Sequence, residues 1–498
     1  MDVLVFHGYL LRGTGSNVYN AQLARALARL GHRVHLLSQE PRPLALPWVD
    51  AVGTWEDGPL RVEARREPAR ITVYRPPIGA VLPVYVADRY EGFDARPFPD
   101  LDDAELDTYL ERNVAAVREV AARVAPGAAL ANHLVMGPAV LARAGLARYA
   151  VKVHGSALEY TVKPHAQRFL PYAREGLARA AGVLVGSRHT AESLWAALDD
   201  PALPGRTRLG PPGVDVHTFA PRPPEEAAAG LAALAARLRE TAPDAGGDDS
   251  FARDATAAGA ALTGLDAQRE HLVAFVGKLI LAKGVDLLLA AWPLVLAAVP
   301  DARLVVVGFG ADRDRLEALA AALAAGERVD AEGLRYLRAF LDHALSDPAY
   351  RAASMRMGET VRFTGRLEHA ELADLLPACE ALVVPSTFPE AFGMVAAEAA
   401  ACGALPISAG HSGLAEVSRV LAAAAPAPAR PWLSFPLGPE AVDGIAERLV
   451  AWLSAPAALR ASTREALAGV ARDRYSWEGV ARGVLAASAG RLDALLSP

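Results

Sequence analysis

Cysteine is scarce in this sequence, which has only Cys379 and Cys402 among its 498 residues. Both stand in apolar, Ala-rich surroundings, which predicts two buried free thiols. So sparse a pair excludes a disulfide-stapled fold. Neither cysteine has neighbours at a metal-ligand spacing, so the sequence offers no cysteine-based metal site.

Positive charge is not in excess, because the formal net charge is -6. That balance gives no global attraction to nucleic acid, and the Arg-rich stretch 61–70 is interpreted as a solvated loop. No uninterrupted apolar run reaches the ~18 residues of a membrane span. The opening MDVLVFHGYL also lacks the features of a signal peptide. We predict a cytoplasmic protein without a transmembrane segment, which leaves peripheral membrane contact open.

The first forty residues have the pattern of a β-loop-α-β unit. Val3–Phe6 is a short apolar run typical of a buried parallel strand. A glycine-containing loop follows, and Ser16 or Asn17 is expected to cap a helix whose leucines recur with helical spacing. Arg33–Ser38 then supplies the next strand. Strands alternating with helices indicate a parallel sheet covered on both faces.

The same alternation continues along the chain and starts again at His271. The further strand candidates are Ile71–Tyr74, Ala150–Val153, Gly182–Val185, Leu272–Val276, Arg303–Val307, Val361–Thr364, Ala381–Val384 and Leu405–Ser408. Residues 40–110 contain many prolines and few periodic runs, which predicts long loops there. Residues 221–270 and 320–358 are interpreted as helical insertions, the first with a flexible stretch, TAPDAGGDDS.

These patterns predict an α/β protein with two doubly wound, parallel-sheet domains that face a cleft. The predicted boundaries are 1–215 for the N-terminal domain and 216–475 for the C-terminal domain. Ligands of such sheets bind where strands end and helices begin, so the cleft is the expected ligand site. The sequence does not specify the oligomeric state.

Two lysines follow a predicted strand of the second domain, in AFVGKLILAKG. Lys278 comes directly after Gly277, and Lys283 stands just before Gly284 and the next helix. Two ammonium groups beside a helix N-terminus suit a diphosphate. The alternative is a pair of exposed loop lysines, and the lysines alone do not decide between the two.

Two glutamates flank a second strand-to-helix junction, in VPSTFPEAFGMVAAEAAACG. Glu390 is on the loop, Gly393 allows close approach of the backbone, and Glu398 lies about one turn inside the helix. A carboxylate accepts two hydrogen bonds from a vicinal diol, so Glu398 fits a ribose and Glu390 a hexose. A single glutamate could simply complement the helix dipole, but that reading does not explain both acids, the loop and the glycine together.

The second segment resembles the Glu, seven residues, Glu motif of glycosyltransferase family 4, which has the GT-B fold of two Rossmann-like domains. VGKLILAKG is similar to the phosphate-binding segment of that family, with Lys278 where the family usually has arginine. FTGRLEHAELADLL, VVVGFGADRDRLE and GHSGLAEV resemble further family segments, and YSWEGVARGVL resembles a closing helix, 476–498, that returns to the first domain. The resemblance implies donor-binding roles for Gly15, Lys278, Lys283, Arg366, Leu367, Phe392, Gly393, Met394, Val395 and Glu398.

In the first domain the resemblance singles out one histidine and one loop. His154 follows a predicted strand, in KVHGS, and is implied to touch the donor sugar near the reacting centre. The GTGS loop, with Gly15, resembles the family's cleft-facing glycine loop. It is not a P-loop, because no Gly-Lys-Ser/Thr follows, and it lacks the third glycine of a dinucleotide fingerprint.

The resemblance implies a retaining hexosyltransferase that moves a sugar from a UDP- or GDP-sugar to a hydroxyl of a small molecule, glycan or lipid. His154, Glu390 and Lys283 are its predicted catalytic residues. Lysines and helix N–H groups stabilise the departing diphosphate, so no metal or other cofactor is expected. The alternatives are a non-catalytic protein that binds a nucleotide or a partner, a phosphorylase with a lysine-bound pyridoxal group, and, least favoured, a nicotinamide oxidoreductase.

Overall fold

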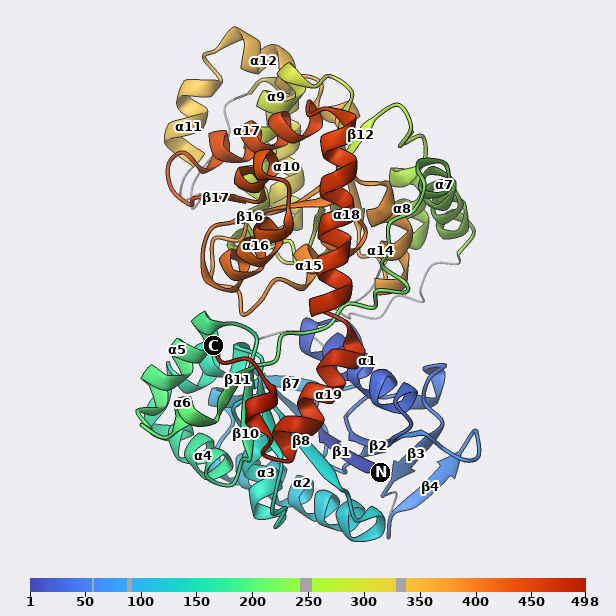
Figure 1. The fold of residues 1–498 in the computed structure, drawn as a ribbon, viewed down its shortest axis with the longest axis vertical. Coiled ribbons are helices and arrows are strands. Elements are labelled where there is room, and N and C mark those ends of the chain that lie inside the picture. The colour runs from blue at the N-terminus through green and yellow to red at the C-terminus, as the bar shows by residue number, and fades with distance from the viewer. Residues whose placement is uncertain (56–57, 87–91, 242–252, 328–336) are drawn as a thin grey trace. The chain divides into compact units, whose positions relative to one another are not determined.

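A computed structural model describes residues 1–55, 58–86, 92–241, 253–327 and 337–498. Contacts divide the chain into two compact units (Figure 1). The first comprises Met1–Gly213 together with Ser476–Pro498, and the second comprises Val214–Tyr475. Residues 242–250 of the predicted flexible stretch lie outside the described part of the chain.

The first unit is built on a nine-stranded sheet with the order β11-β10-β9-β8-β1-β2-β5-β3-β4. Its strands are β1 (Asp2–Phe6), β2 (Arg33–Leu37), β3 (Ala51–Thr54), β4 (Arg61–Ala64), β5 (Ile71–Arg75), β8 (Ala128–Asn132), β9 (Ala150–Val153), β10 (Gly182–Val185) and β11 (Thr207–Leu209). All neighbours are parallel except β3 and β4. The strand order reverses between β1 and β8, so the ends of these two strands mark the switch point of the sheet.

Helices of the first unit connect these strands. They are α1 (Gly15–Arg29), α2 (Asp103–Val124), α3 (Gly137–Arg143), α4 (Ala166–Ala178), α5 (Arg188–Leu198), α6 (Leu203–Arg206) and α19 (Trp477–Ser488). Trp477 is buried and lies edge-on to Tyr19 of α1 at 5.4 Å between ring centroids. Arg29 donates to Glu478 at 2.7 Å. The last helix of the chain thus packs beside α1 within the first unit (Figure 1).

Two expectations for the first unit are wrong. The described part of residues 40–110 is not only loops around the predicted strand Ile71–Tyr74, since it also forms β3, β4, β6 (Val81–Val84), β7 (Asp94–Pro97) and the start of α2. These four further strands are only four residues long, too short to show a periodic pattern. Neither Ser16 nor Asn17 caps α1: Thr14 is its N-cap residue, and Asn17 is buried inside the first turn.

The second unit is built on a six-stranded, all-parallel sheet with the order β14-β13-β12-β15-β16-β17. Its strands are β12 (His271–Val276), β13 (Ala302–Val307), β14 (Val361–Gly365), β15 (Ala381–Val384), β16 (Leu405–Ala409) and β17 (Ser434–Phe435). Counted along the chain this is the order 3-2-1-4-5-6 of a doubly wound sheet, with its switch point between β12 and β15. The prediction of an α/β chain with two parallel sheets is confirmed.

Helices surround the second sheet, and its core includes the buried Trp292, Trp452 and Phe435. The helices are α7 (Pro224–Glu240), α8 (Ala255–Leu262), α9 (Val285–Ala298), α10 (Arg313–Ala325), α11 (Leu337–Ala344), α12 (Pro348–Ser354), α13 (Met357–Thr360), α14 (His369–Leu375), α15 (Met394–Ala401), α16 (Ser412–Ala424), α17 (Ala441–Leu453) and α18 (Ala457–Arg474). The described parts of the two predicted insertions are helical, as α7–α8 and α10–α13. Cys379 and Cys402 are buried free thiols, as predicted.

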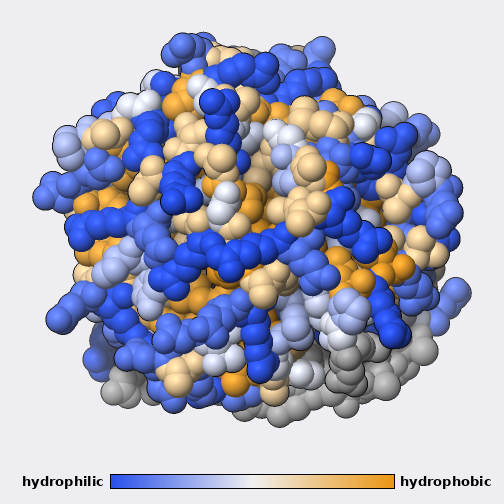
Figure 2. Space-filling model, turned by 90° about the horizontal axis from the view of Figure 1, so that it is seen from below, coloured by the Kyte–Doolittle hydropathy of each residue, from blue (hydrophilic) through white to orange (hydrophobic). Residues whose placement is uncertain are grey.

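Exposed apolar side chains are few in the described part of the chain. The large ones are Met1, Val62, Val86, Tyr160, Met355, Phe388 and Leu496. Figure 2 shows one face of the molecule, where hydrophilic residues interrupt the apolar spots. None of the helices in the described residues is long and apolar enough to cross a membrane.

One buried charge in the first unit predicts a pH-dependent stability. Lys152 on β9 is 2% exposed, and its Nζ donates to the Gly210 carbonyl at 2.6 Å. Burial lowers the pKa of Lys152 to about 7. The unfolded chain, with an ordinary lysine, therefore binds more protons between about pH 7 and 10.5, so this group makes the protein more stable as the pH rises through that window.

The Lys152→Met variant removes this contribution and keeps most of the side-chain volume. Between pH 6.5 and 9.5 we expect the melting temperature of the wild type to rise relative to that of the variant by roughly several degrees, since one pKa unit corresponds to about 1.4 kcal/mol. Thermal unfolding followed by circular dichroism at both pH values measures the difference. Parallel pH dependences of the two proteins would contradict it.

Candidate functional site

The candidate donor site lies at the switch point of the second sheet, where β12 and β15 end. The loop after β12 leads to Lys283 and α9, and the loop after β15 leads to Glu390 and α15. The Thr387 backbone N–H donates to the Ala282 carbonyl at 2.9 Å, which joins the two loops. Gly284 has φ +69°, and a Cβ there would lie 2.0 Å from the Pro385 carbonyl oxygen, so only glycine allows this approach.

Lys283 and Glu390, which the sequence separates by more than a hundred residues, form an ion pair across these loops. Ser386 Oγ donates to the same Glu390 Oε1 at 2.6 Å. Burial raises the pKa of Glu390, but the charge and hydrogen bond of Lys283 and the hydroxyl of Ser386 together lower it below the ordinary value. Glu390 is therefore a carboxylate at neutral pH and serves as an acceptor of hydrogen bonds, not as an acid.

Residues that the sequence analysis did not single out hold the Glu390 loop in place. The Glu390 backbone N–H donates to Ser412 Oγ at 2.9 Å, and Gly413 N–H donates to the Glu390 carbonyl at 2.9 Å. His411 Nε2 donates to the Ser386 carbonyl at 2.7 Å. His411, Ser412 and Gly413 belong to the segment GHSGLAEV, which the sequence marked only by its resemblance to a family segment. A polar pair directly before a helix was the available signal.

The second predicted glutamate is buried inside α15. Glu398 is 3% exposed, and its Oε1 accepts a hydrogen bond from His369 Nε2 at 2.7 Å. Gly393, with φ +126°, stands at the N-terminus of α15, where no side chain caps the helix. The first turn of α15 contains Met394 and Val395, both half-buried, and the buried Phe392 precedes it. His369 is a further residue that the sequence analysis passed over.

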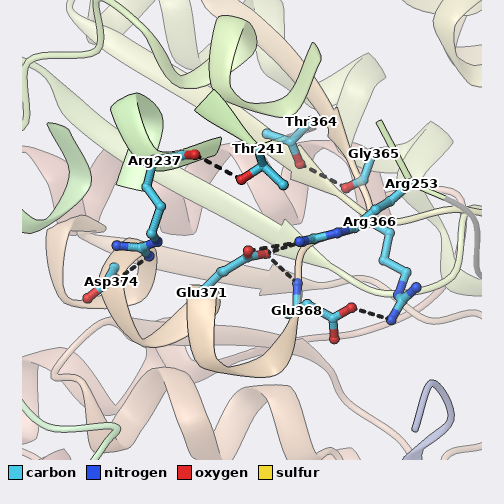
Figure 3. A network of polar contacts seen from close by, with 9 residues as sticks. All are labelled: Arg237, Thr241, Arg253, Thr364, Gly365, Arg366, Glu368, Glu371 and Asp374. Atoms are coloured by element: carbon cyan, nitrogen blue, oxygen red, sulfur yellow. Dashed lines mark hydrogen bonds and ion pairs between the residues drawn. The ribbon is translucent and has the colours of Figure 1, made fainter. Parts of the chain in front are cut away.

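Two more predicted donor-binding residues follow β14, and one follows β12. Arg366 Nη2 donates to Glu368 Oε1 at 2.6 Å (Figure 3). Leu367 is buried. Lys278 Nζ lies 5.9 Å from the centroid of the Phe309 ring, a cation–π contact. The strands are parallel, so all these residues lie at the carboxyl-end edge of one sheet, which is where ligands of doubly wound sheets bind.

In the first unit, His154 follows β9 and is the first member of a hydrogen-bonded series of polar side chains. His154 Nε2 donates to Asn132 Oδ1 at 2.8 Å, and Asn132 Nδ2 donates to Asn20 Oδ1 at 2.7 Å. Asn20 Nδ2 in turn donates to His7 Nδ1 at 3.0 Å. Burial, together with the neighbouring His133, Lys152 and His7, holds the pKa of His154 well below its ordinary value. His154 is therefore a neutral imidazole with Nδ1 as its hydrogen-bond acceptor.

His7 and Asn132 are not among the residues predicted from the sequence. His7 follows β1 and Asn132 ends β8, at the switch point of the first sheet. Their position at strand ends was the signal that could have found them. Gly15 is the first residue of α1, and Tyr19 of the same helix lies edge-on to His154 at 5.0 Å. Gly15 thus lies about one helical turn before the residue of α1 that contacts His154.

Part of the chain matches a known family model. Residues 265–339 and 347–422 match the family model described as glycosyl transferases group 1. A D-inositol 3-phosphate glycosyltransferase of Segniliparus rotundus is 32% identical over 291 residues, which are 57% of this chain and 46% of that protein. A GDP-mannose-dependent monoacylated alpha-(1-6)-phosphatidylinositol monomannoside mannosyltransferase of Corynebacterium glutamicum is 26% identical over 54% of this chain and 52% of its own. The chain spans about half the length of these curated relatives.

A comparison with solved structures agrees on the fold. The structure of HepE from Anabaena, solved with UDP and glucose, superposes with a TM-score of 0.58 at 16% identity, covering 99% of both chains. This likeness shows the α/β fold to be of the GT-B type. The residues of the candidate donor site from Lys278 to Glu398 fall largely inside the matched ranges. Both stretches that match the family model of glycosyl transferases group 1 thus lie in the second unit.

Proposed function

We propose that this protein is a retaining, family 4-like glycosyltransferase that moves a hexose from a UDP- or GDP-sugar to a hydroxyl acceptor. The observation that carries the proposal is the Lys283–Glu390 pair at the switch point of the second sheet. It pairs an ammonium group from one strand-to-helix junction with a carboxylate from the neighbouring one. A diphosphate needs the first group and a sugar hydroxyl the second.

The proposed chemistry follows from the charge that develops on the leaving group. As the bond between the sugar and the diphosphate breaks, negative charge grows on the phosphate oxygens. Lys283, Lys278 and the N–H groups at the start of α9 and α15 stabilise that charge, so the reaction proceeds without a metal ion. A phosphate oxygen of the donor takes the acceptor proton on the same face of the sugar, which retains the anomeric configuration.

The two glutamates and His154 each bind a different part of the donor. Glu390 accepts hydrogen bonds from hydroxyls of the hexose, and Glu398, held by His369, accepts those of the ribose. The neutral His154 offers Nδ1 to a hydroxyl of the sugar. The acceptor is a hydroxyl compound, and the names of the two curated relatives favour an inositol- or lipid-linked one.

A panel of UDP-, GDP- and ADP-sugars tests the proposal by thermal shift and by release of the nucleotide, with EDTA present throughout. A donor at 100 times its Kd stabilises the folded protein by about 2.7 kcal/mol, which raises the melting temperature by several degrees. We expect one nucleotide class to give this shift and to be hydrolysed slowly without acceptor. No shift with any donor would contradict nucleotide-sugar binding. A shift without turnover would favour a non-catalytic binding protein, and turnover only after Mg²⁺ addition would contradict metal independence.

A further inference from the structure

The first turn of α14 positions two side chains of the candidate donor site, one just before the helix and one at its first residue. Arg366, just before the helix, is held by Glu368 at 2.6 Å. His369, the first residue of the helix, donates to the buried Glu398 at 2.7 Å. The geometry of this single turn therefore sets the positions of two side chains on the side of the site where the nucleoside is expected.

Glu371 is the residue that holds this turn, through contacts with both Arg253 and the Glu368 backbone (Figure 3). One oxygen, Oε2, accepts a hydrogen bond from the Glu368 backbone N–H at 2.6 Å. Both of its oxygens also accept from Arg253 Nη1, at 2.7 and 2.9 Å. The Glu371 and Arg253 side chains are only 12% and 15% exposed. A charge pair this sheltered is screened less by solvent than a surface pair, so it can fix the turn firmly.

A second carboxylate ties the same helix to the same segment of the chain. Asp374 accepts from Arg222 Nη1 at 3.0 Å and from Arg237 Nη2 at 3.0 Å. Arg222, Arg237 and Arg253 all belong to residues 221–270, the segment that the sequence marked as an insertion. Three guanidinium groups of that segment thus hold two carboxylates of α14.

The helix needs this external support because it is short. α14 has seven residues, and isolated helices of fewer than about 12 residues are marginal in water. Its direction and its first turn are therefore set by the groups that hold it. The α7–α8 segment also packs against the sheet next to β14, the strand that leads into this turn.

We propose that residues 221–241 and 253–262 brace the nucleoside end of the donor site, with Arg253 and Glu371 as positioning residues for Arg366 and His369. The inference rests on the proposed function, because it assigns the neighbourhood of Arg366 and His369 to the nucleoside of the donor. The brace fixes the part of the site that reads the nucleoside and leaves the diphosphate part, at Lys283, unaffected.

The test compares two probes in the full chain by calorimetry: the nucleoside diphosphate that the wild type binds best, from UDP, GDP and ADP, and inorganic pyrophosphate. For Arg253→Met we expect the Kd of the nucleoside diphosphate to rise about 10-fold, a loss of about 1.4 kcal/mol, with the Kd of pyrophosphate unchanged. Glu371→Gln weakens the same pair and should have a similar effect. At saturating donor, kcat should stay within about 2-fold, while the donor KM rises with the Kd.

Two further variants separate positioning from general destabilisation. Arg253→Lys retains the charge and should recover part of the affinity, and it is the variant to use if Arg253→Met does not fold. Arg303→Met is the matched control: it breaks the Arg303–Glu270 pair (2.8 Å, 22% and 17% exposed), which lies at the amino ends of β12 and β13, opposite the candidate site. It should leave both Kd values unchanged.

Each contrary result has its own meaning. If Arg253→Met and Glu371→Gln bind the nucleoside diphosphate as the wild type does, the brace is wrong and the proposed function stands. The brace would also be overturned if Arg253→Met weakened pyrophosphate binding as much as nucleoside diphosphate binding. The same holds if Arg303→Met raised the Kd of the nucleoside diphosphate as much as Arg253→Met does. A wild type that binds none of the three nucleotides would overturn the proposed function, and the brace with it.

Discussion

Replacing Glu390 by glutamine is expected to lower kcat by about 10²–10³ while the protein stays folded, on the scale of removing one group that stabilises a transition state. The Glu390 carboxylate is ionised, because Lys283 and Ser386 outweigh the effect of its burial on its pKa. Glutamine has nearly the same shape and can still accept from Ser386. It loses the negative charge that faces Lys283 and, by our proposal, the reacting sugar.

Steady-state kinetics with the donor identified by thermal shift measures this effect, and circular dichroism verifies the fold. Glu398→Ala is the matched control on the same segment. Glu398 lies inside α15, paired with His369, and is proposed to bind the ribose. Its loss should therefore act mainly through donor affinity, raising the donor KM more than it lowers kcat. A wild-type kcat for Glu390→Gln, together with a wild-type donor KM for Glu398→Ala, would show that the site has been assigned to the wrong residues.

Replacing Lys283 by methionine is expected to have an effect of similar size, a fall in kcat of about 10²–10³. Lys283 stands directly before the N-terminus of α9, where it is proposed to stabilise the charge that grows on the diphosphate. The variant loses that charge stabilisation and also leaves Glu390 without its ion-pair partner. A partly buried carboxylate that loses its cation is strongly disfavoured in its charged form.

The pH dependence of the rate provides a second measurement on the same variant. Lys283 lowers the pKa of Glu390 and burial raises it, so removing the lysine raises that pKa. The rate requires the ionised carboxylate and falls as the pH drops through its pKa. In Lys283→Met the acid limb of kcat should therefore move to higher pH.

Lys278→Met is the control for this prediction, because Lys278 Nζ lies over the Phe309 ring and the ion-pair partner of Glu390 is Lys283. It should weaken donor binding without moving the acid limb. An unchanged acid limb in Lys283→Met, or an equal shift in Lys278→Met, would contradict the coupling between Lys283 and Glu390.

Much of the fold could be read from short apolar runs. Val3–Phe6, Ala150–Val153 and Ala381–Val384 are strands because continuous apolar residues suit the buried strands of a parallel sheet. β8 has the sequence AALAN, in which alanines carry little strand preference, and β4 is an exposed edge strand rich in charge. Neither has a local signal, because their pairing partners decide that they are strands.

The candidate site, too, was predictable from the sequence only in part. The positions of Lys283, Glu390 and Glu398 beside helix starts follow from the sequence, since a strand, a glycine and a helical run occur in order. The roles of Ser386, His411 and Ser412 do not follow from the sequence. Each of them holds Glu390 or its loop through a tertiary contact, and no spacing along the chain predicts such a contact. Sequence patterns thus located the loops and their charged residues but not the groups that orient them.

The sequence alone determined the type of those elements that have a clear apolar run or helical spacing, the two α/β halves, and the chemistry of the residues at their strand ends. Only the tertiary structure decided which of these residues meet. The order of the strands brings the ends of β12 and β15 together, and so Lys283 meets Glu390. The same folding lets Arg253 reach Glu371, 118 residues away. The physical reason is that helix and strand periodicity reports only neighbours along the chain, whereas ion pairs form between side chains that are close in space.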